Sequence, residues 1–136
     1  MNEEKDIRWI QRASNFDKSY QLLSHSLEIP SPTETERAGI IQFFEMTFEL
    51  AWKLLKDYLL EEGLKPKSPR QTLKQAFQIE IIRNGRLWLE ALEARNATLH
   101  TYDENTAIDI EQKIRNDYFP LLVELKVWIE QQINTK

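Results

Sequence analysis

The sequence predicts an all-α protein, built as an up-and-down bundle of four or five helices. Along most of the chain, apolar residues recur at intervals of three or four, the spacing that places them on one face of a helix. Only three glycines and five prolines interrupt the chain of 136 residues, and no stretch has the alternation typical of a strand. This length suits one domain, over residues 1–136, with a single core.

The first two helices are expected at residues 4–27 and 34–62. Thr33 and Glu36 have the spacing of a capping box, which marks the start of the second helix, and Gly63 is the residue type that commonly ends one. The apolar face of the first helix should contain Ile7, Ile10, Ala13, Phe16, Tyr20, Leu23 and Leu27.

Apolar residues on the second helix cover more than one stripe, so it should be the central element of the bundle. The same pattern also fits a core helix that lines a dimer interface, and both explanations stand. Glu45 and Glu49 lie one turn apart within this apolar run, where unpaired charges are costly. We therefore expect them at the edge of the buried face.

Ser68 and Pro69 fit the N-cap and first residue of a third helix that runs to about residue 84. Its inner face should contain Leu73, Ala76, Phe77 and Ile81. A locally basic patch, with no acidic residue between positions 64 and 79, surrounds its start. A solvated loop and helix start would explain this patch, as would a surface for RNA or a protein partner. The patch consists of Lys65, Lys67, Arg70 and Lys74.

A fourth helix is expected at about residues 86–97, and a fifth from about residue 105. Pro120 should kink or restart the fifth helix near Tyr118. The expected inward residues are Leu87, Trp88, Ala91 and Leu92 on the fourth helix, and Ile108, Ile114, Phe119, Leu122, Leu125, Val127, Trp128 and Ile129 on the fifth.

Composition excludes several classes of function. The chain has no cysteine, which rules out disulfides and thiol nucleophiles, and no clustered carboxylates or histidines that would indicate a metal site. No apolar run approaches the roughly 18 residues needed to span a bilayer, and the acidic N-terminus is not an export signal, so a cytoplasmic protein is expected. The net charge of −4 argues against coating nucleic acid, although a local cationic cleft remains compatible with it.

The stretch from Glu90 to Glu104 concentrates the candidate site residues, which are Arg95, Asn96, His100 and Tyr102. On one continuous helix, Arg95 and His100 would point about 140° apart. If Arg95 and Asn96 instead occupy the last turn of one helix and His100 a short connection, both can face one cleft. Arg95 could bind phosphate there or form a structural ion pair with a Glu. Tyr102 could simply pack its ring, and His25 is expected on the surface.

Three stretches of the sequence resemble the HEPN-domain proteins of the HepT type, also called nucleotidyltransferase substrate-binding proteins. Arg95, Asn96, His100 and Tyr102 match each position of that family's motif. Residues 48–59 and 67–70 are similar to the same family, so the resemblance covers most of the chain from about Phe43 onward.

The resemblance implies a homodimer and a companion nucleotidyltransferase, the MNT antitoxin. In the toxin form, two motifs would meet across the dimer as a metal-independent ribonuclease site without a cofactor. His100 would be the general base or acid, Arg95 would stabilise the phosphate and Asn96 would orient one of them. The companion enzyme would add AMP to Tyr102 and switch the site off. The alternative is a non-catalytic subunit that presents substrate or nucleotide to a nucleotidyltransferase.

Overall fold

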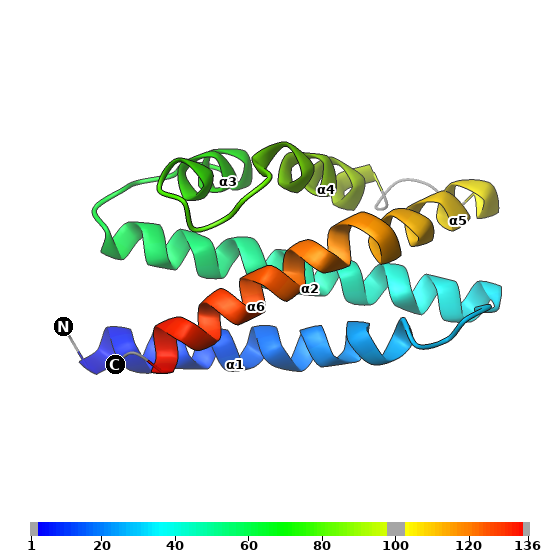
Figure 1. Ribbon diagram of the computed structural model, residues 1–136, viewed down its shortest axis with the longest axis horizontal. Coiled ribbons are helices and arrows are strands. Elements are labelled where there is room, and N and C mark those ends of the chain that lie inside the picture. Colours follow the sequence, from blue (N-terminus) through cyan, green and yellow to red (C-terminus); the bar gives the residue numbers. More distant parts are fainter. Residues whose placement is uncertain (1–2, 98–102, 135–136) are drawn as a thin grey trace.

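The computed structural model describes residues 3–97 and 103–134 of the chain. The elements in order are α1 (Glu3–Ser26), α2 (Glu34–Glu61), α3 (Pro69–Gln78), α4 (Gly85–Ala97), α5 (Glu104–Lys113), the π-helical segment η1 (Ile114–Tyr118) and α6 (Phe119–Asn134). No strand occurs among the described residues, and the all-α prediction is confirmed. None of the helices in these ranges is long and apolar enough to cross a membrane. In Figure 1, α1 and α2 are long neighbours, with α3 and α4 along the opposite side of α2.

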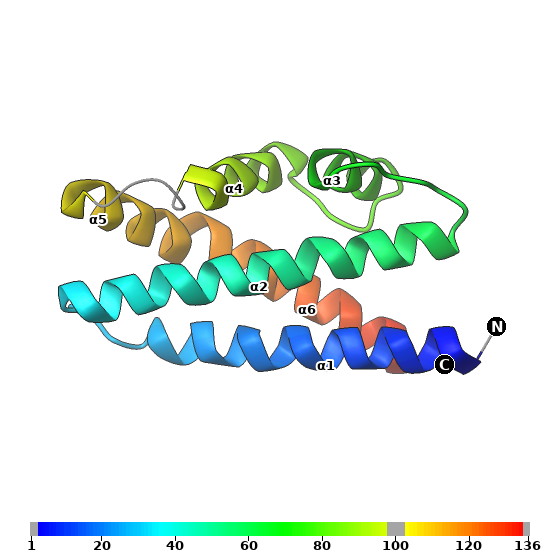
Figure 2. The same cartoon turned by 180° about the vertical axis from the view of Figure 1, so that it is seen from behind.

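The helix α2 occupies the centre of the bundle, as predicted, and packs against α1, α3, α4, α5 and α6 (Figure 2). Its capping box forms as expected, with Thr33 Oγ1 accepting from the Glu36 amide and Glu36 Oε1 accepting from the Thr33 amide. Gly63 follows its end with a φ of 87°, a left-handed conformation that suits glycine. The central core residues from α2 are Ile40, Phe44, Phe48, Ala51, Leu54, Leu55 and Leu59.

The apolar face of α1 differs from the prediction at its N-terminal end. Ile7 and Ile10 are 65% and 53% exposed, whereas Trp9 is buried. Trp9 instead continues the stripe of Ala13, Phe16, Tyr20 and Leu23 and packs its ring against Tyr58 and Trp128, each at 5.9 Å between ring centroids. The larger aromatic surface therefore occupies the inward position. The helix itself begins and ends within one residue of the expected limits.

The third helix is shorter than predicted, because α3 ends at Gln78 rather than near residue 84. The chain then turns through Glu80 and Asn84, which both have positive φ values, before α4 begins. Ile82, which lies in this turn, is buried in the core. Phe77 is 50% exposed, and Ile81 is only partly buried, so the predicted inner face is confirmed for Leu73 and Ala76 alone.

The fifth predicted helix consists of α5, η1 and α6, which follow one another without a break. Pro120 is the second residue of α6, and its ring would crowd the carbonyl four residues earlier in a regular α-helix. The wider π-helical turn lies directly before it, with the Phe119 amide donating to the Ile114 carbonyl. The irregularity thus lies where the sequence predicts it. Ile108 and Val127 are exposed, contrary to the predicted inward face.

A polar network joins the end of α5 and the segment η1 to the start of α2 and to the connection between α1 and α2. Glu111 is buried, with one carboxylate oxygen accepting from Arg37 Nε at 2.8 Å and the other from Arg115 Nε at 2.6 Å. Arg115 also donates to the carbonyls of Leu27 and Ile29. Burial by itself raises the pKa of Glu111, but the hydrogen bonds from Arg115 and Arg37 outweigh it and hold that pKa below its ordinary value.

Candidate functional site

Arg95 and Asn96 lie in the last turn of α4, as predicted, and α5 begins after the N-cap residue Asp103. Asp103 accepts a hydrogen bond from the Asn105 amide and another from the Thr106 hydroxyl. His100 and Tyr102 fall between these two helices and lie outside the described residues. The motif therefore extends from the C-terminal end of α4 to the N-terminal end of α5.

The Arg95 guanidinium is held by a carboxylate of the central helix. Its Nη2 donates to Glu49 Oε2 at 2.8 Å, and its Nη1 donates to Asn96 Oδ1 at 3.3 Å. Glu49 also accepts from the indole of Trp52 at 3.1 Å and pairs with Lys53 at 3.4 Å. The ion pair that the sequence left open for Arg95 is thus present. Because both partners remain partly exposed, 24% for Arg95 and 31% for Glu49, this pair stays within reach of a ligand.

A cavity of about 340 Å³ lies beside this ion pair and joins the three stretches that carry the family resemblance. Its lining residues come from α2, from the start of α3 and from the end of α4. Its lining consists of Glu49, Trp52, Ser68, Pro69, Arg70, Leu92, Glu93, Arg95 and Asn96. Segments far apart in sequence therefore build one site.

Glu49 and Trp52 both line the cavity, although the sequence predicts Glu49 only as a residue at the edge of the buried face and does not single out Trp52. Glu49 is indeed half-buried at the edge of the α2 interface, as expected. The signal that could have identified it is the position of a carboxylate within an apolar run, where a charge requires a partner. That the partner is Arg95, 46 positions away, follows only from the fold.

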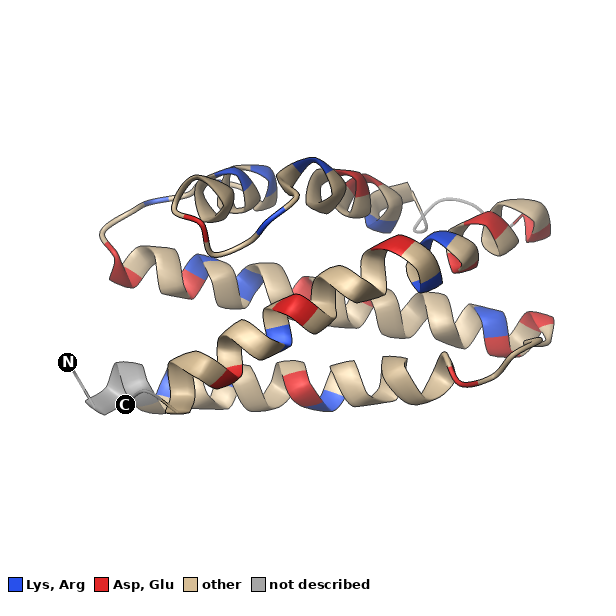
Figure 3. Cartoon of the chain, viewed as in Figure 1, with Lys and Arg blue, Asp and Glu red and all other residues tan. Residues whose placement is uncertain are grey.

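The structure separates the predicted basic patch into two parts. Arg70 lines the cavity beside Arg95, and its guanidinium lies 3.7 Å from Glu93. Lys74 lines a neighbouring groove, and Lys65 and Lys67 are exposed. Figure 3 shows Lys and Arg positions in blue in the connection before α3 and on α3 itself. His25 is exposed in the last turn of α1, as expected, and α1 contributes no residue to the cavity.

The described part of the site contains hydrogen-bond donors of the type that suit an anion. An arginine presents a planar set of donors suited to phosphate, and the Asn96 amide adds a further polar group. The titratable groups lining the cavity are two carboxylates and two arginines, so the described lining has no histidine for proton transfer. No group of three or more His, Asp or Glu side chains among the described residues could hold a metal ion.

Comparison with known proteins gives a consistent family. The model of the family described as "Nucleotidyltransferase substrate binding protein like" matches residues 11–131. A Haemophilus influenzae protein named "Probable ribonuclease HepT" is 29% identical over 103 residues, which cover 72% of this chain and 68% of the relative.

Two solved structures share the fold. A Thermus thermophilus protein is 33% identical, with a TM-score of 0.78 over 84% of this chain and 98% of that one. The tri-AMPylated HEPN toxin of Shewanella oneidensis, solved in complex with an MNT antitoxin, has a TM-score of 0.74 at 15% identity over the full length of both chains. The family match spans nearly the whole chain, so this protein belongs to the nucleotidyltransferase substrate binding protein-like family.

Proposed function

We propose that the chain is the toxin of a toxin-antitoxin pair, a metal-independent ribonuclease whose site is completed by a second copy of the chain. The observation that carries this proposal is the cavity at the end of α4, where Arg95 pairs with Glu49 and Asn96 lines the same cavity. The relative named as a probable ribonuclease supports the reaction class.

In the proposed reaction, the 2′-hydroxyl of RNA attacks the adjacent phosphorus and the 5′-oxygen leaves. The products are a 2′,3′-cyclic phosphate and a 5′-hydroxyl. His100 moves a proton as general base or acid, and Arg95 stabilises the negative charge that builds on the phosphorane. Glu49 keeps the guanidinium at the cavity wall and so reduces the freedom that Arg95 loses on binding phosphate. One chain supplies one motif histidine, which is why two chains are proposed.

The test is cleavage of single-stranded RNA by purified protein in the presence of a chelator. His100→Ala should lower the rate roughly 10²- to 10⁴-fold, because a general acid-base contribution is removed. The matched control is His25→Ala, which removes an exposed histidine on α1 and should leave the rate unchanged. Loss of activity on chelation, or an unchanged rate in His100→Ala, would contradict the proposal.

We further propose that a companion MNT-type nucleotidyltransferase silences the site by transferring AMP to Tyr102. The phenolic oxygen of Tyr102 attacks the α-phosphorus of ATP, pyrophosphate leaves, and the phenolic proton passes to solvent. The AMPylated Shewanella oneidensis toxin, in its complex with an MNT antitoxin, supports this assignment. Mass spectrometry after incubation with the companion, ATP and magnesium should show AMP on the wild type and none on Tyr102→Phe. AMP on the Phe variant would place the acceptor elsewhere.

The second candidate is a non-catalytic subunit that presents substrate or nucleotide to a nucleotidyltransferase. The description of the matching family as substrate binding proteins favours it. The two functions differ in a simple measurement, because a binding subunit would retain a ligand yet leave RNA intact. Binding without cleavage by the purified wild type, at every protein concentration tested, would select this second function.

A further inference from the structure

A second and larger hollow adjoins the proposed catalytic cavity. It is a groove of about 510 Å³ between α3 and α4, within the size range of ligand pockets. Arg70 and Glu93 line both the groove and the cavity that holds Arg95. An extended ligand bound at Arg95 could therefore continue into the groove without leaving the surface.

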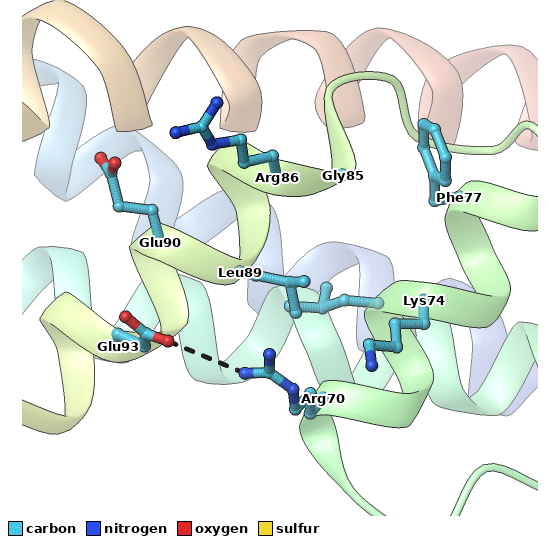
Figure 4. A pocket seen from close by; sticks show the side chains of 9 residues that line it. Arg70, Lys74, Phe77, Gly85, Arg86, Leu89, Glu90 and Glu93 are labelled. Atoms are coloured by element: carbon cyan, nitrogen blue, oxygen red, sulfur yellow. Dashed lines mark ion pairs between the residues drawn. The ribbon is translucent and has the colours of Figure 1, made fainter.

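The groove carries cations at its rims and an aromatic ring at one end. Figure 4 shows Arg70 and Lys74 extending from α3, Arg86 extending from α4 on the other side of Leu89, and Phe77 at the end of α3. Phe77 is 50% exposed, although burying a ring of this size is strongly favourable. An exposed ring beside three cations is the combination on which single-stranded nucleic acids stack their bases and place their phosphates.

Gly85 explains how the Phe77 ring keeps its place against α4. A Cβ atom at position 85 would lie 3.0 Å from Phe77 Cγ and 3.1 Å from Cδ2, closer than ordinary van der Waals contact. The absence of a side chain at the first residue of α4 thus lets the ring lie directly on the helix start. About half of Phe77 nevertheless remains exposed to solvent.

The two acidic residues of the groove, Glu90 and Glu93, have partners that leave Lys74 and Arg86 able to contact a phosphate. Glu93 pairs with Arg70 at 3.7 Å, and both side chains are more than half exposed, so this pair is weak and a phosphate can replace the carboxylate. Glu90 accepts a hydrogen bond from the Tyr118 hydroxyl and lies 3.7 Å from Lys113.

We propose that this groove binds a nucleotide of single-stranded RNA next to the cleaved bond, with its base on Phe77 and its phosphates beside Lys74 and Arg86. The proposal rests on the proposed ribonuclease function and adds the path of the substrate. Paired RNA is excluded as the occupant, because its base faces are already stacked within the helix and cannot lie on the ring.

The test measures binding of the full-length protein to a short single-stranded oligonucleotide with 2′-O-methyl riboses, which cannot be cleaved through the 2′-oxygen. Lys74→Gln and Arg86→Gln should each weaken binding and reduce the slope of log affinity against log salt by about 0.7, the value for one phosphate contact on a single strand. Phe77→Leu should weaken binding roughly 5- to 100-fold with an unchanged salt slope, because stacking releases no counterions.

Two further measurements separate the ring from the fold. An oligonucleotide lacking the stacked base should bind wild type and Phe77→Leu equally, and Gly85→Ala, which displaces the ring, should resemble Phe77→Leu. The controls are Lys18→Gln and Ile10→Ala, an exposed cation and an exposed apolar residue on α1. Circular dichroism establishes that each variant is folded.

The outcomes distinguish this inference from the function on which it rests. A wild type that neither binds nor cleaves RNA would contradict both. If the wild type cleaves RNA but the Phe77, Lys74 and Arg86 variants bind RNA like the controls, RNA binding in the groove is contradicted and the ribonuclease function is not. Variants that lose binding to the companion nucleotidyltransferase but retain RNA binding would assign the groove to that protein and would also overturn the inference.

Discussion

Glu111 is the buried carboxylate among the described residues of the bundle. It accepts hydrogen bonds from Arg37 of α2 and from Arg115 of η1. Arg37 also contacts Glu104, the first residue of α5, while Arg115 binds two carbonyls in the connection after α1. The cluster around Glu111 therefore links α2, the connection after α1 and the helix that begins at Glu104.

Replacing Glu111 by Gln should destabilise the protein by roughly 3 kcal/mol or more, because two largely buried guanidinium groups lose their shared charge partner. The matched control is Glu93→Gln, whose exposed pair with Arg70 should be worth less than about 1 kcal/mol. Urea unfolding of the two variants and the wild type measures the difference. Equal losses in both variants would contradict the structural role of Glu111.

Tyr118 is expected to make the stability of the protein fall at alkaline pH. Burial, and then the hydrogen bond to Glu90, raise the pKa of Tyr118 well above its ordinary value of 10.0. Above pH 10 the unfolded chain releases this proton while the folded chain keeps it, so stability falls as pH rises. Tyr118→Phe should lose stability less steeply, by up to about 1.4 kcal/mol per pH unit. Parallel curves from denaturant titrations above pH 10 would refute this.

The helices α2 and α3 begin directly after their N-cap residues. Thr33 and Ser68 each accept a hydrogen bond from a backbone amide in the first turn, which satisfies a donor that the helix itself leaves unpaired. Pro120 does not break the helix. The helix instead widens to a π-helical turn just before Pro120. The helix from α5 to α6 therefore remains continuous along the bundle.

Thr33→Ala should cost about 1 kcal/mol of stability, because the Glu36 amide loses the Thr33 Oγ1 that accepts its hydrogen bond, while the backbone amide of residue 33 can still donate to Glu36. Thr35→Ala is the control, since Thr35 is exposed in the first turn of α2 and alanine is the better helix former there. Thermal melts should show a lower Tm for the first variant and an equal or slightly higher Tm for the second. Equal shifts would remove the capping argument.

The arrangement of the whole bundle changes the reason for expecting a dimer. The apolar residues of α2 are covered largely by the chain's own helices, with Met46 and Leu60 as its exposed large apolar residues. Exposed apolar surface on α2 therefore gives no reason to expect a homodimer. The remaining reason to expect a homodimer is chemical, because the proposed site needs two motifs and one chain supplies one.

We expect a homodimer of twice the 16.2 kDa chain mass, measured by light scattering without the companion protein. If the site requires both copies, cleavage per chain should also rise with protein concentration and then level off as the dimer fills, by mass action. A monomer mass together with constant activity per chain would contradict the composite site and leave a single-chain mechanism.

Local signals in the sequence predict where α1, α2, α3 and α5 begin and that Arg95 and Asn96 lie at the end of α4, because caps and apolar periodicity act within a few neighbouring residues; the same signals place the end of α3 too late, near residue 84. The sequence correctly set Thr33 as a cap, Arg95 and Asn96 on the last turn of α4, and the irregularity before Pro120. The tertiary structure decided which apolar residues are inside, as when Trp9 replaces Ile7 and Ile10. It also brought Glu49 to Arg95 and Phe77 to the groove, because a side chain's burial and partners depend on distant segments that no local pattern encodes.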